Sequence, residues 1–209
     1  MPESAIPRWL QWAQEIQALS QTGLTYSNSP YEVQRYTRFM EIAAEIVAGH
    51  TSLDREEMLA DFHAQPGYAT PKVDVRGAVV RDGQILLVQE QVDGLWCMPG
   101  GWADVGDQPS EMVVREVLEE SGFHVVARKL AGVFDANRSG RPLSLYHAYK
   151  LVFLCDIVGG EARGSDETLD AGFFSFDGLP PLSSNRTNER HLAEVRAHLH
   201  DPARPAAFD

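Results

Sequence analysis

The chain has 209 residues, of which 44% are hydrophobic and 23% are charged. This length predicts one or two domains, and the composition excludes an intrinsically disordered chain. The net charge of −12 argues against a nucleic-acid partner, because phosphate neutralisation needs clustered Lys and Arg. The two cysteines, Cys97 and Cys155, are too few for a disulfide framework. The sequence shows neither the pattern of a signal peptide nor an apolar run long enough to span a membrane, so we expect a cytoplasmic protein without a membrane partner.

Helical periodicity dominates residues 1–65, which we expect to form an all-helical N-terminal domain. The spacing predicts helices over Pro7–Leu19 and Pro30–Gly49, then a short helix capped by Thr51 or Ser52. The apolar side chains of the second helix recur every three or four residues and predict a buried face. Because a broad apolar face needs a partner surface, this domain is expected to mediate homodimerisation or to form a wall over a substrate cleft.

Residues 66–71 contain two prolines and a glycine, which predicts a linker. Beyond it, residues 72–209 are expected to form a second domain, because strand-like and helical patterns are interspersed there. We expect strands at 73–80, 85–88, 96–98, 125–134, 146–157 and 173–176, and helices at 109–121 and 187–199. The run Arg81-Asp82-Gly83 predicts a tight turn between the first two strands, and Gly122 predicts the end of the first helix.

The first helix of this second domain carries an acidic arc. At 100° per residue, Glu116, Glu119 and Glu120 lie within about 100° of one another. A solvated helix face is one interpretation, but like charges at this spacing repel, whereas hard divalent cations among the oxygens would favour the cluster. Arg115 lies four residues from both Glu111 and Glu119, so it is predicted to neutralise and orient a neighbouring carboxylate.

The acidic arc lies within a longer pattern, G-x5-E-x7-R-E-U-x-E-E-x-G-U, where U is a bulky apolar residue. Over residues 101–123 the sequence resembles this signature of the Nudix hydrolases. Eight of the nine specified positions match, namely Gly101, Arg115, Glu116, Val117, Glu119, Glu120, Gly122 and Phe123. Asp107 stands where the family usually has Glu, which puts a direct metal role for that position in doubt. The resemblance implies an α+β fold, the Nudix α/β/α sandwich with a mixed sheet.

The resemblance also implies a site that binds Mg²⁺ (or Mn²⁺). The implied metal ligands are the main-chain carbonyl of Gly100 and the carboxylates of Glu116, Glu119 and Glu120. The implied catalytic residues are Arg115, Glu119, Glu120 and Glu167. Glu119 or Glu167 would accept the proton of an attacking water, and Arg115 would orient its neighbours. For Glu167, which precedes a strand that carries two phenylalanines, a solvated loop acid is the alternative.

A narrower resemblance covers nearly the whole chain. The helical segment and the motifs Phe134-Asp135-x-Asn137-Arg138, Tyr146-His147-x-Tyr149-Lys150 and Leu182-Ser183-x-x-Arg186-Thr187 resemble the Nudix subgroup with a small helical N-terminal domain. Members of that subgroup act on ADP-ribose-like compounds or CDP-choline. The candidate substrate contacts are Arg138, Arg186, Tyr146 and Tyr149, with surface ion pairs and core packing as the alternatives. Ala136 stands where a basic residue is expected.

The implied reaction is hydrolysis of the phosphoanhydride in a nucleoside diphosphate linked to another group. Its products would be a nucleoside monophosphate and a second phosphorylated compound. One alternative is sanitation of nucleoside triphosphates, which releases pyrophosphate. Another is a non-catalytic nucleotide-sensing domain, which would be expected to lack some of the carboxylates. We expect a small-molecule nucleotide as the partner and a homodimer as the assembly.

Overall fold

The structure is a computed structural model that describes residues 7–136 and 146–209. Within these ranges the chain divides into two compact units, one ending at Pro71 and the other beginning at Lys72. Tyr146 and His147 group with the N-terminal unit. In the described part of the chain, no helix combines the length and hydropathy that a membrane span requires.

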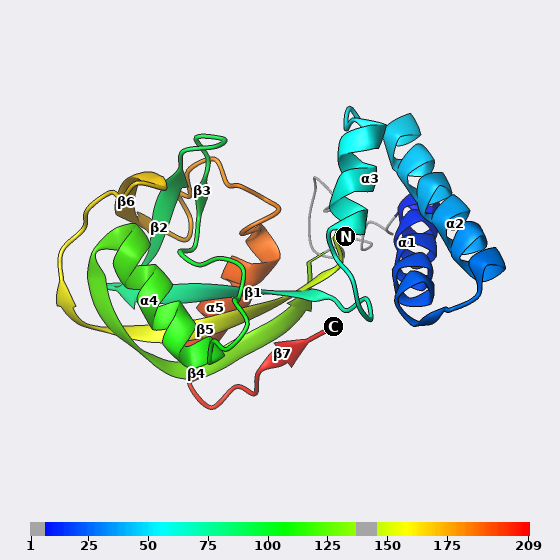
Figure 1. Cartoon of the computed structure of the whole chain (residues 1–209). Helices are drawn as coiled ribbons and strands as arrows, with labels where there is room; N and C mark the ends of the chain where they lie inside the picture. Colours follow the sequence, from blue (N-terminus) through cyan, green and yellow to red (C-terminus); the bar gives the residue numbers. More distant parts are fainter. Residues whose placement is uncertain (1–6, 137–145) are drawn as a thin grey trace. The chain divides into compact units, whose positions relative to one another are not determined.

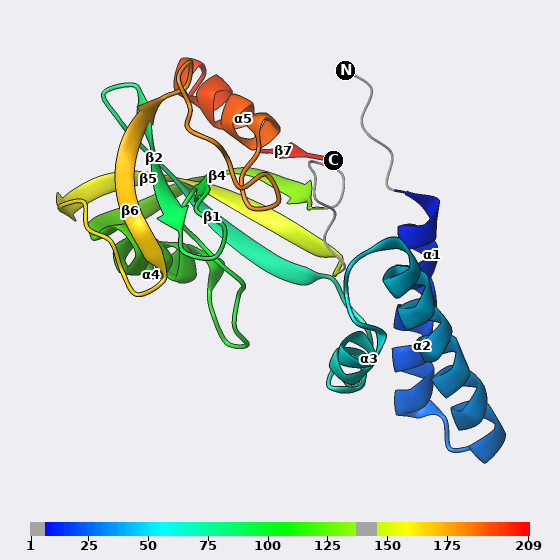
Figure 2. The ribbon, with the colours of Figure 1, turned by 90° about the horizontal axis from the view of Figure 1, so that it is seen from above.

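The N-terminal unit consists of the helices α1 (Arg8–Tyr26), α2 (Pro30–His50) and α3 (Arg55–His63) (Figure 1). The first two lie side by side (Figure 2). Their contact is filled by small and flexible side chains, which let the helices approach closely. The buried residues of this core are Ala13, Met40, Ala43, Ala44, Val47, Met58 and Phe62. The helical domain expected from the periodicity is therefore present, with a core of its own.

Two helix ends differ from the sequence prediction. Helix α1 continues past Leu19 to Tyr26, and polar side chains of the added turns hydrogen-bond to the helix backbone, as when Ser20 donates to the carbonyl of Ile16. The predicted cap of α3 at Thr51 or Ser52 is wrong. The Asp54 side chain caps this helix, because it accepts hydrogen bonds from the backbone N–H groups of Glu56 and Glu57. The Thr51 hydroxyl instead donates to the last turn of α2.

The C-terminal unit is built on a mixed sheet. Its strands are β1 (Lys72–Arg81), β2 (Gln84–Glu90), β3 (Trp96–Cys97), β4 (Phe123–Asp135), β5 (Ala148–Gly160), β6 (Thr168–Ser175) and β7 (Ala207–Phe208), and its helices are α4 (Pro109–Ser121) and α5 (Glu189–His200). The strand order is β3-β2-β1-β5-β4-β7, and β6 pairs with β2. The pairs β1–β5 and β4–β7 are parallel and the others are antiparallel.

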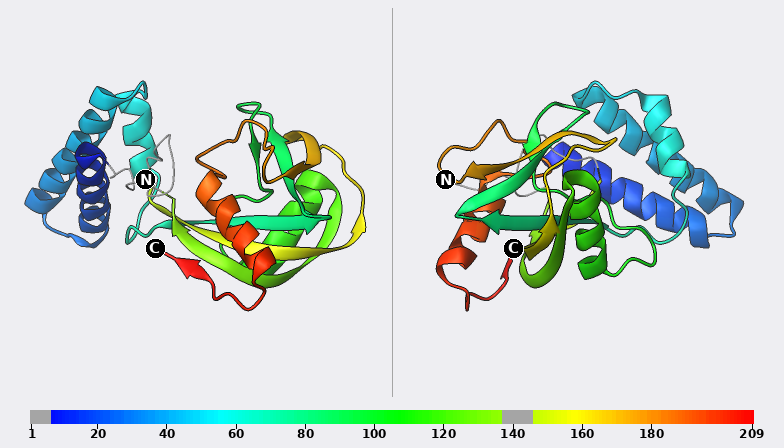
Figure 3. Two further views of the ribbon diagram at one scale, coloured as in Figure 1. Left: turned by 180° about the vertical axis from the view of Figure 1, so that it is seen from behind. Right: turned by 90° about the vertical axis from the view of Figure 1, so that its left-hand side faces the viewer.

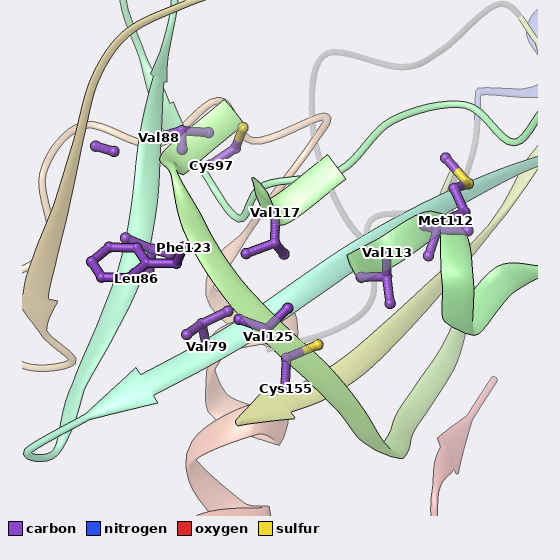
Figure 4. Packing of buried hydrophobic residues seen from close by; sticks show 12 residues of the cluster. Val79, Leu86, Val88, Cys97, Met112, Val113, Val117, Phe123, Val125 and Cys155 are labelled. Atoms are coloured by element: carbon purple, nitrogen blue, oxygen red, sulfur yellow. The ribbon is translucent and has the colours of Figure 1, made fainter. Parts of the chain in front are cut away.

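Helices α4 and α5 cover opposite faces of the sheet, as the front view and the view from behind show (Figures 1 and 3). Alternation along each strand sends side chains to both layers: Val79 of β1 packs on the α4 side, whereas its neighbour Ala78 packs on the α5 side. Figure 4 shows the α4 layer, in which Val113 and Val117 meet side chains of the sheet. The α/β/α sandwich with a mixed sheet is confirmed.

Two turns have the conformations that the sequence predicts, one between β1 and β2 and one at the end of α4. Asp82 and Gly83, with φ of 53° and 76°, form the hairpin turn between β1 and β2. Gly122, with φ of 78°, ends α4 in the left-handed conformation, and its N–H bonds back to Leu118. The strand predicted at 173–176 begins earlier, at Thr168. Its first residues pair with β2 although Leu169 and Asp170 are solvent-exposed, so the apolar pattern did not reveal them.

Candidate active site

A cleft of about 650 Å³ lies in the C-terminal unit, where α4, the segment after β3 and the loops before β6 and α5 meet. Its lining residues are Arg76, Glu90, Gly100, Gly101, Trp102, Glu116, Glu119, Glu120, Arg163, Ser165, Asp166, Glu167 and Arg186. The structure therefore brings together six of the residues expected in the site, namely Gly100, Glu116, Glu119, Glu120, Glu167 and Arg186. They come from segments that lie as much as 86 residues apart, the difference between positions 100 and 186.

Backbone hydrogen bonds to β1 place the segment before α4. The N–H of Gly77 donates to Pro99, and the N–H of Val75 donates to Gly101, at 2.8 and 2.9 Å. Between these bonds Gly100 adopts φ of 139°, and a Cβ there would lie 2.0 Å from the carbonyl oxygen of Val75. Only glycine fits this position. The freed Gly100 N–H donates to the Glu120 carboxylate at 2.8 Å, so the loop and α4 are tied together at the centre of the cleft.

The Glu116 and Glu120 carboxylates are partly or fully buried in the cleft, where they repel one another. Burial raises the pKa of Glu120 to about 7, against the opposing influence of Arg76 and the Gly100 N–H. Burial and the neighbouring charge of Glu119 also raise the pKa of Glu116. A carboxyl whose pKa is raised lacks compensation for its negative charge. The protein by itself therefore leaves a deficit of positive charge on this face of α4.

The donor set fits a hard divalent cation. In residues 7–136 and 146–209, no three His, Cys, Asp or Glu side chains gather closely enough to hold a metal ion by themselves. Mg²⁺ does not require such a cage, since it usually takes one or two carboxylates and completes its shell with water and substrate phosphates. Burial, with a further contribution from neighbouring carboxylates, raises the pKa of Glu116 and Glu120, so a cation at these oxygens would stabilise their charged forms.

Arg115 contacts two carboxylates, those of Asp107 and Glu116. Its guanidinium donates two hydrogen bonds to Asp107, at 2.8 and 3.1 Å, and lies 3.6 Å from Glu116. Arg115 therefore lies close to a neighbouring carboxylate of its own helix, and the loop before α4 folds back to offer it a bidentate acceptor as well. Arg115 lowers the pKa of Asp107. Asp107, the one departure from the Nudix pattern, thus holds Arg115 beside Glu116.

The residues expected to bind substrate have different surroundings. Arg186 lies in the cleft, where its guanidinium is 3.2 Å from Glu90 and 3.0 Å from Asp93. Tyr146 belongs to the N-terminal unit and hydrogen-bonds with the side chains of Asp61 and Gln65. Tyr149 is 44% exposed on β5. Neither tyrosine is among the residues that line the cleft, so their contacts with substrate stay predictions.

Arg138 lies outside the described residues. The same holds for Asn137 in the motif that contains it, so the expected substrate contact of this loop stays a prediction. His147 is half-buried and is not among the cleft residues. Glu167, by contrast, is exposed at the cleft on the loop before β6, next to Asp166.

A buried charge cluster beside the cleft was missed by the sequence analysis. Arg76 donates two hydrogen bonds to Asp74, at 2.9 and 3.0 Å, and Lys150 lies 3.5 Å from the same carboxylate. The spacing of Asp74 and Arg76, two residues apart in an apolar strand, indicates that both side chains lie on one face of the sheet. Their partner on β5 was not visible, because it follows from parallel pairing that places Asp74 opposite Lys150.

Comparison with known proteins agrees with this architecture. Residues 71–195 match the model of the NUDIX domain, and residues 7–62 match a UDP-X-like, N-terminal oligomerisation domain. The Bacillus subtilis protein YjhB, provisionally named an ADP-ribose pyrophosphatase, is 40% identical over 97% of both chains. An ADP-ribose pyrophosphatase of Methanocaldococcus jannaschii is 34% identical over 56% of this chain and 69% of its own.

Solved structures give the same result. A crystal structure of a UDP-X diphosphatase is 32% identical, covers 96% of this chain and 98% of its own, and superposes with a TM-score of 0.63. The ADP-ribose pyrophosphatase of Streptococcus suis is 38% identical over 67% of this chain and 100% of its own, with a TM-score of 0.62. The chain belongs to the Nudix family, as the signature in residues 101–123 implies.

We expect Glu120→Gln to keep the fold but to abolish hydrolysis and weaken Mn²⁺ binding, because Gln retains an acceptor for Gly100 without the charge. In the metal-free protein, the raised pKa means that ionisation of Glu120 costs stability as the pH rises from 4.5 to about 7. At pH 8 the metal-free variant should therefore melt above the metal-free wild type. Added Mn²⁺ should raise the melting temperature of the wild type far more than that of the variant.

The matched control is Glu111→Gln, which removes an exposed carboxylate from the first turn of the same helix. It should bind Mn²⁺ and turn over like the wild type. Near-normal activity of Glu120→Gln at saturating Mg²⁺, or an equal Mn²⁺-induced rise in melting temperature, would contradict the assignment.

Proposed function

We propose that this Nudix protein hydrolyses the phosphoanhydride of a nucleoside diphosphate linked to another moiety, as in ADP-ribose. The observation that carries the proposal is the cleft itself, in which the α4 carboxylates share one space with the Arg186 guanidinium. Such a cleft suits a diphosphate that arrives with divalent cations and presents further anionic oxygens to an arginine. The named activities of the relatives from Methanocaldococcus jannaschii and Streptococcus suis support the substrate class.

In this proposal Glu116, Glu120 and the carbonyl of Gly100 hold Mg²⁺ or Mn²⁺, with Glu119 as a further ligand. When bound, the cation supplies Lewis-acid stabilisation of charge on the phosphate oxygens. The chain's own groups do the rest. Arg186 binds a phosphate oxygen, and Arg115, held by Asp107, keeps the Glu116 carboxylate in place.

The general base is Glu119 or Glu167 in this proposal. Both carboxylates are exposed at the cleft, so each can hold a water and accept its proton during attack on phosphorus. The loop that carries Glu167 is anchored to α4 and β2. Thr168 donates to the carbonyl of Glu120 at 2.8 Å, and the N–H of Gln91 donates to the carbonyl of Glu167. This anchoring keeps the two candidate bases in one cleft.

We expect the wild type with Mg²⁺ or Mn²⁺ to convert ADP-ribose to AMP and ribose 5-phosphate, because attack on either phosphorus of the diphosphate separates two monophosphates. The measurement is product identification by chromatography, with CDP-choline, UDP-sugars and modified nucleoside triphosphates as parallel substrates. Glu120→Gln serves as the control for contaminating activity. Release of pyrophosphate from a triphosphate, with no cleavage of any diphosphate-linked compound, would contradict the proposal and favour triphosphate sanitation.

We also propose that the helical unit joins two copies of the chain into a homodimer. Its match to an oligomerisation domain supports this, and so does an apolar groove of about 880 Å³ in the same unit. Large hydrophobic side chains at this groove are exposed to solvent, among them Leu19 at 62% and Phe39 at 48%. Burial of such surface against a second copy would be favourable. A cytoplasmic location stays a prediction of the sequence.

Phe39→Glu should convert the dimer into a folded monomer, because it places a charge on the apolar groove. Light scattering after size-exclusion chromatography measures the mass of each species, and circular dichroism reports the fold. The control is Gln34→Glu, which adds the same charge to an exposed position of α2 outside the groove lining. A monomeric wild type, or a Phe39→Glu variant that remains dimeric, would contradict this proposal.

A further inference from the structure

Lys150 is a buried cation with three hydrogen-bond donors and three acceptors around it. Its side chain is on β5 with only 1% exposure. The ammonium lies 3.5 Å from the Asp74 carboxylate and donates to the main-chain carbonyls of Asn185 and Arg186, at 3.1 and 2.6 Å. A lysine ammonium has three N–H donors and no acceptor. Two of these donors bond to the carbonyls, and the charge is paired with Asp74.

The two carbonyls belong to the segment that carries Arg186 into the cleft. This segment is irregular, since it lies between β6 and α5. Its carbonyls at 185 and 186 are satisfied by a side chain rather than by strand or helix bonds. The position of the Arg186 backbone therefore depends on a charge fixed in the sheet.

Asp74 connects this contact to a second segment of the cleft, the one that leads to Gly100. The same carboxylate holds Arg76, which donates to the carbonyl of Met98 at 3.1 Å. The N–H of Met98 in turn donates to the hydroxyl of Thr187 at 2.9 Å. Met98 lies two residues before Gly100. The buried cluster therefore binds two segments of the cleft at once. One leads to Gly100, and the other carries Arg186.

We propose that Lys150 is a positioning residue for the substrate-binding cleft, which acts by holding the Arg186 backbone in place with Asp74 as its counter-ion. The inference rests on the proposed function, because there Arg186 binds a phosphate oxygen. Charge and geometry both support it. A buried cation is retained only where it is paired and hydrogen-bonded, and here both hydrogen bonds lead to the cleft segment. Burial lowers the pKa of Lys150 to about 8, while Asp74 favours its charged form.

Lys150→Met tests the proposal, because it keeps a long side chain and removes every donor. We expect KM for ADP-ribose to rise about tenfold, with kcat changed less than about threefold, since binding of the phosphate weakens while the α4 carboxylates stay in place. Lys150→Arg, which keeps the charge and donors, should restore part of the loss. An unchanged KM in Lys150→Met would overturn the proposal.

Lys129→Met is the matched control. The Lys129 ammonium also donates to two main-chain carbonyls of an irregular segment, those of Pro202 and Arg204, but neither of these residues lines the cleft. This variant loses the same kind of contact, so it should lower the melting temperature without raising KM. An equal rise of KM in both variants would show a general structural effect and overturn the proposal.

A double variant tests whether Lys150 affects KM through Arg186. Arg186→Ala alone should raise KM by at least as much as Lys150→Met. In the Arg186→Ala background, Lys150→Met should add almost nothing, because the side chain that it positions is gone. Full additivity of the two effects would overturn the proposal.

Amide hydrogen exchange provides a test that needs no substrate. The N–H groups of Arg186 and Thr187 both donate to the carbonyl of Ser183, so their protection reports the order of this segment. We expect Lys150→Met to lower that protection about tenfold or more, and Lys129→Met to leave it unchanged. If the wild type cleaves no diphosphate-linked nucleotide, the proposed function fails while this measurement still stands. Wild-type protection in Lys150→Met would overturn the positioning role.

Discussion

The hydrogen bond from the Gly100 N–H to the Glu120 carboxylate is the contact on which the cleft depends. It requires a backbone conformation that only glycine tolerates against β1, and it requires α4 to present its acidic face to that loop. Both demands place negative charge where little water reaches it, since Glu120 is buried, and this burial raises its pKa. A cleft of this kind is unfavourable as an empty structure and becomes favourable with cations and an anionic substrate.

The buried cations are the second half of this electrostatic arrangement. Arg76 and Lys150 share Asp74, so the cluster carries more positive than negative charge. Arg76 offsets part of the negative charge of Glu120. Through main-chain carbonyls, Arg76 and Lys150 also hold the segments on either side of the cleft. Although the overall charge is −12, fixed buried cations therefore lie at and beside the acidic cleft.

The sequence reveals the parts of the site that are local in the chain. Glu116, Glu119 and Glu120 share a helical arc, and Gly122 ends that helix, so neighbouring residues suffice to predict them. The roles of Asp74 and Lys150 depend on the pairing of β1 with β5. The two residues are separated by 76 positions in the chain, the difference between 74 and 150. No local pattern encodes that register. The pairing of Arg115 with Asp107 was missed for a similar reason, since it depends on how a loop folds back.

Compensation of the negative charge of the cleft by a divalent cation can be measured directly. Titration calorimetry of the metal-free wild type with Mn²⁺, in buffers of different ionisation enthalpy, measures the protons released on binding. Because the pKa of Glu120 is raised to about 7, we predict release of about half a proton per Mn²⁺ at pH 7 and almost none at pH 9. Mn²⁺ binding without any proton release at pH 7, or no Mn²⁺ binding at all, would contradict the account.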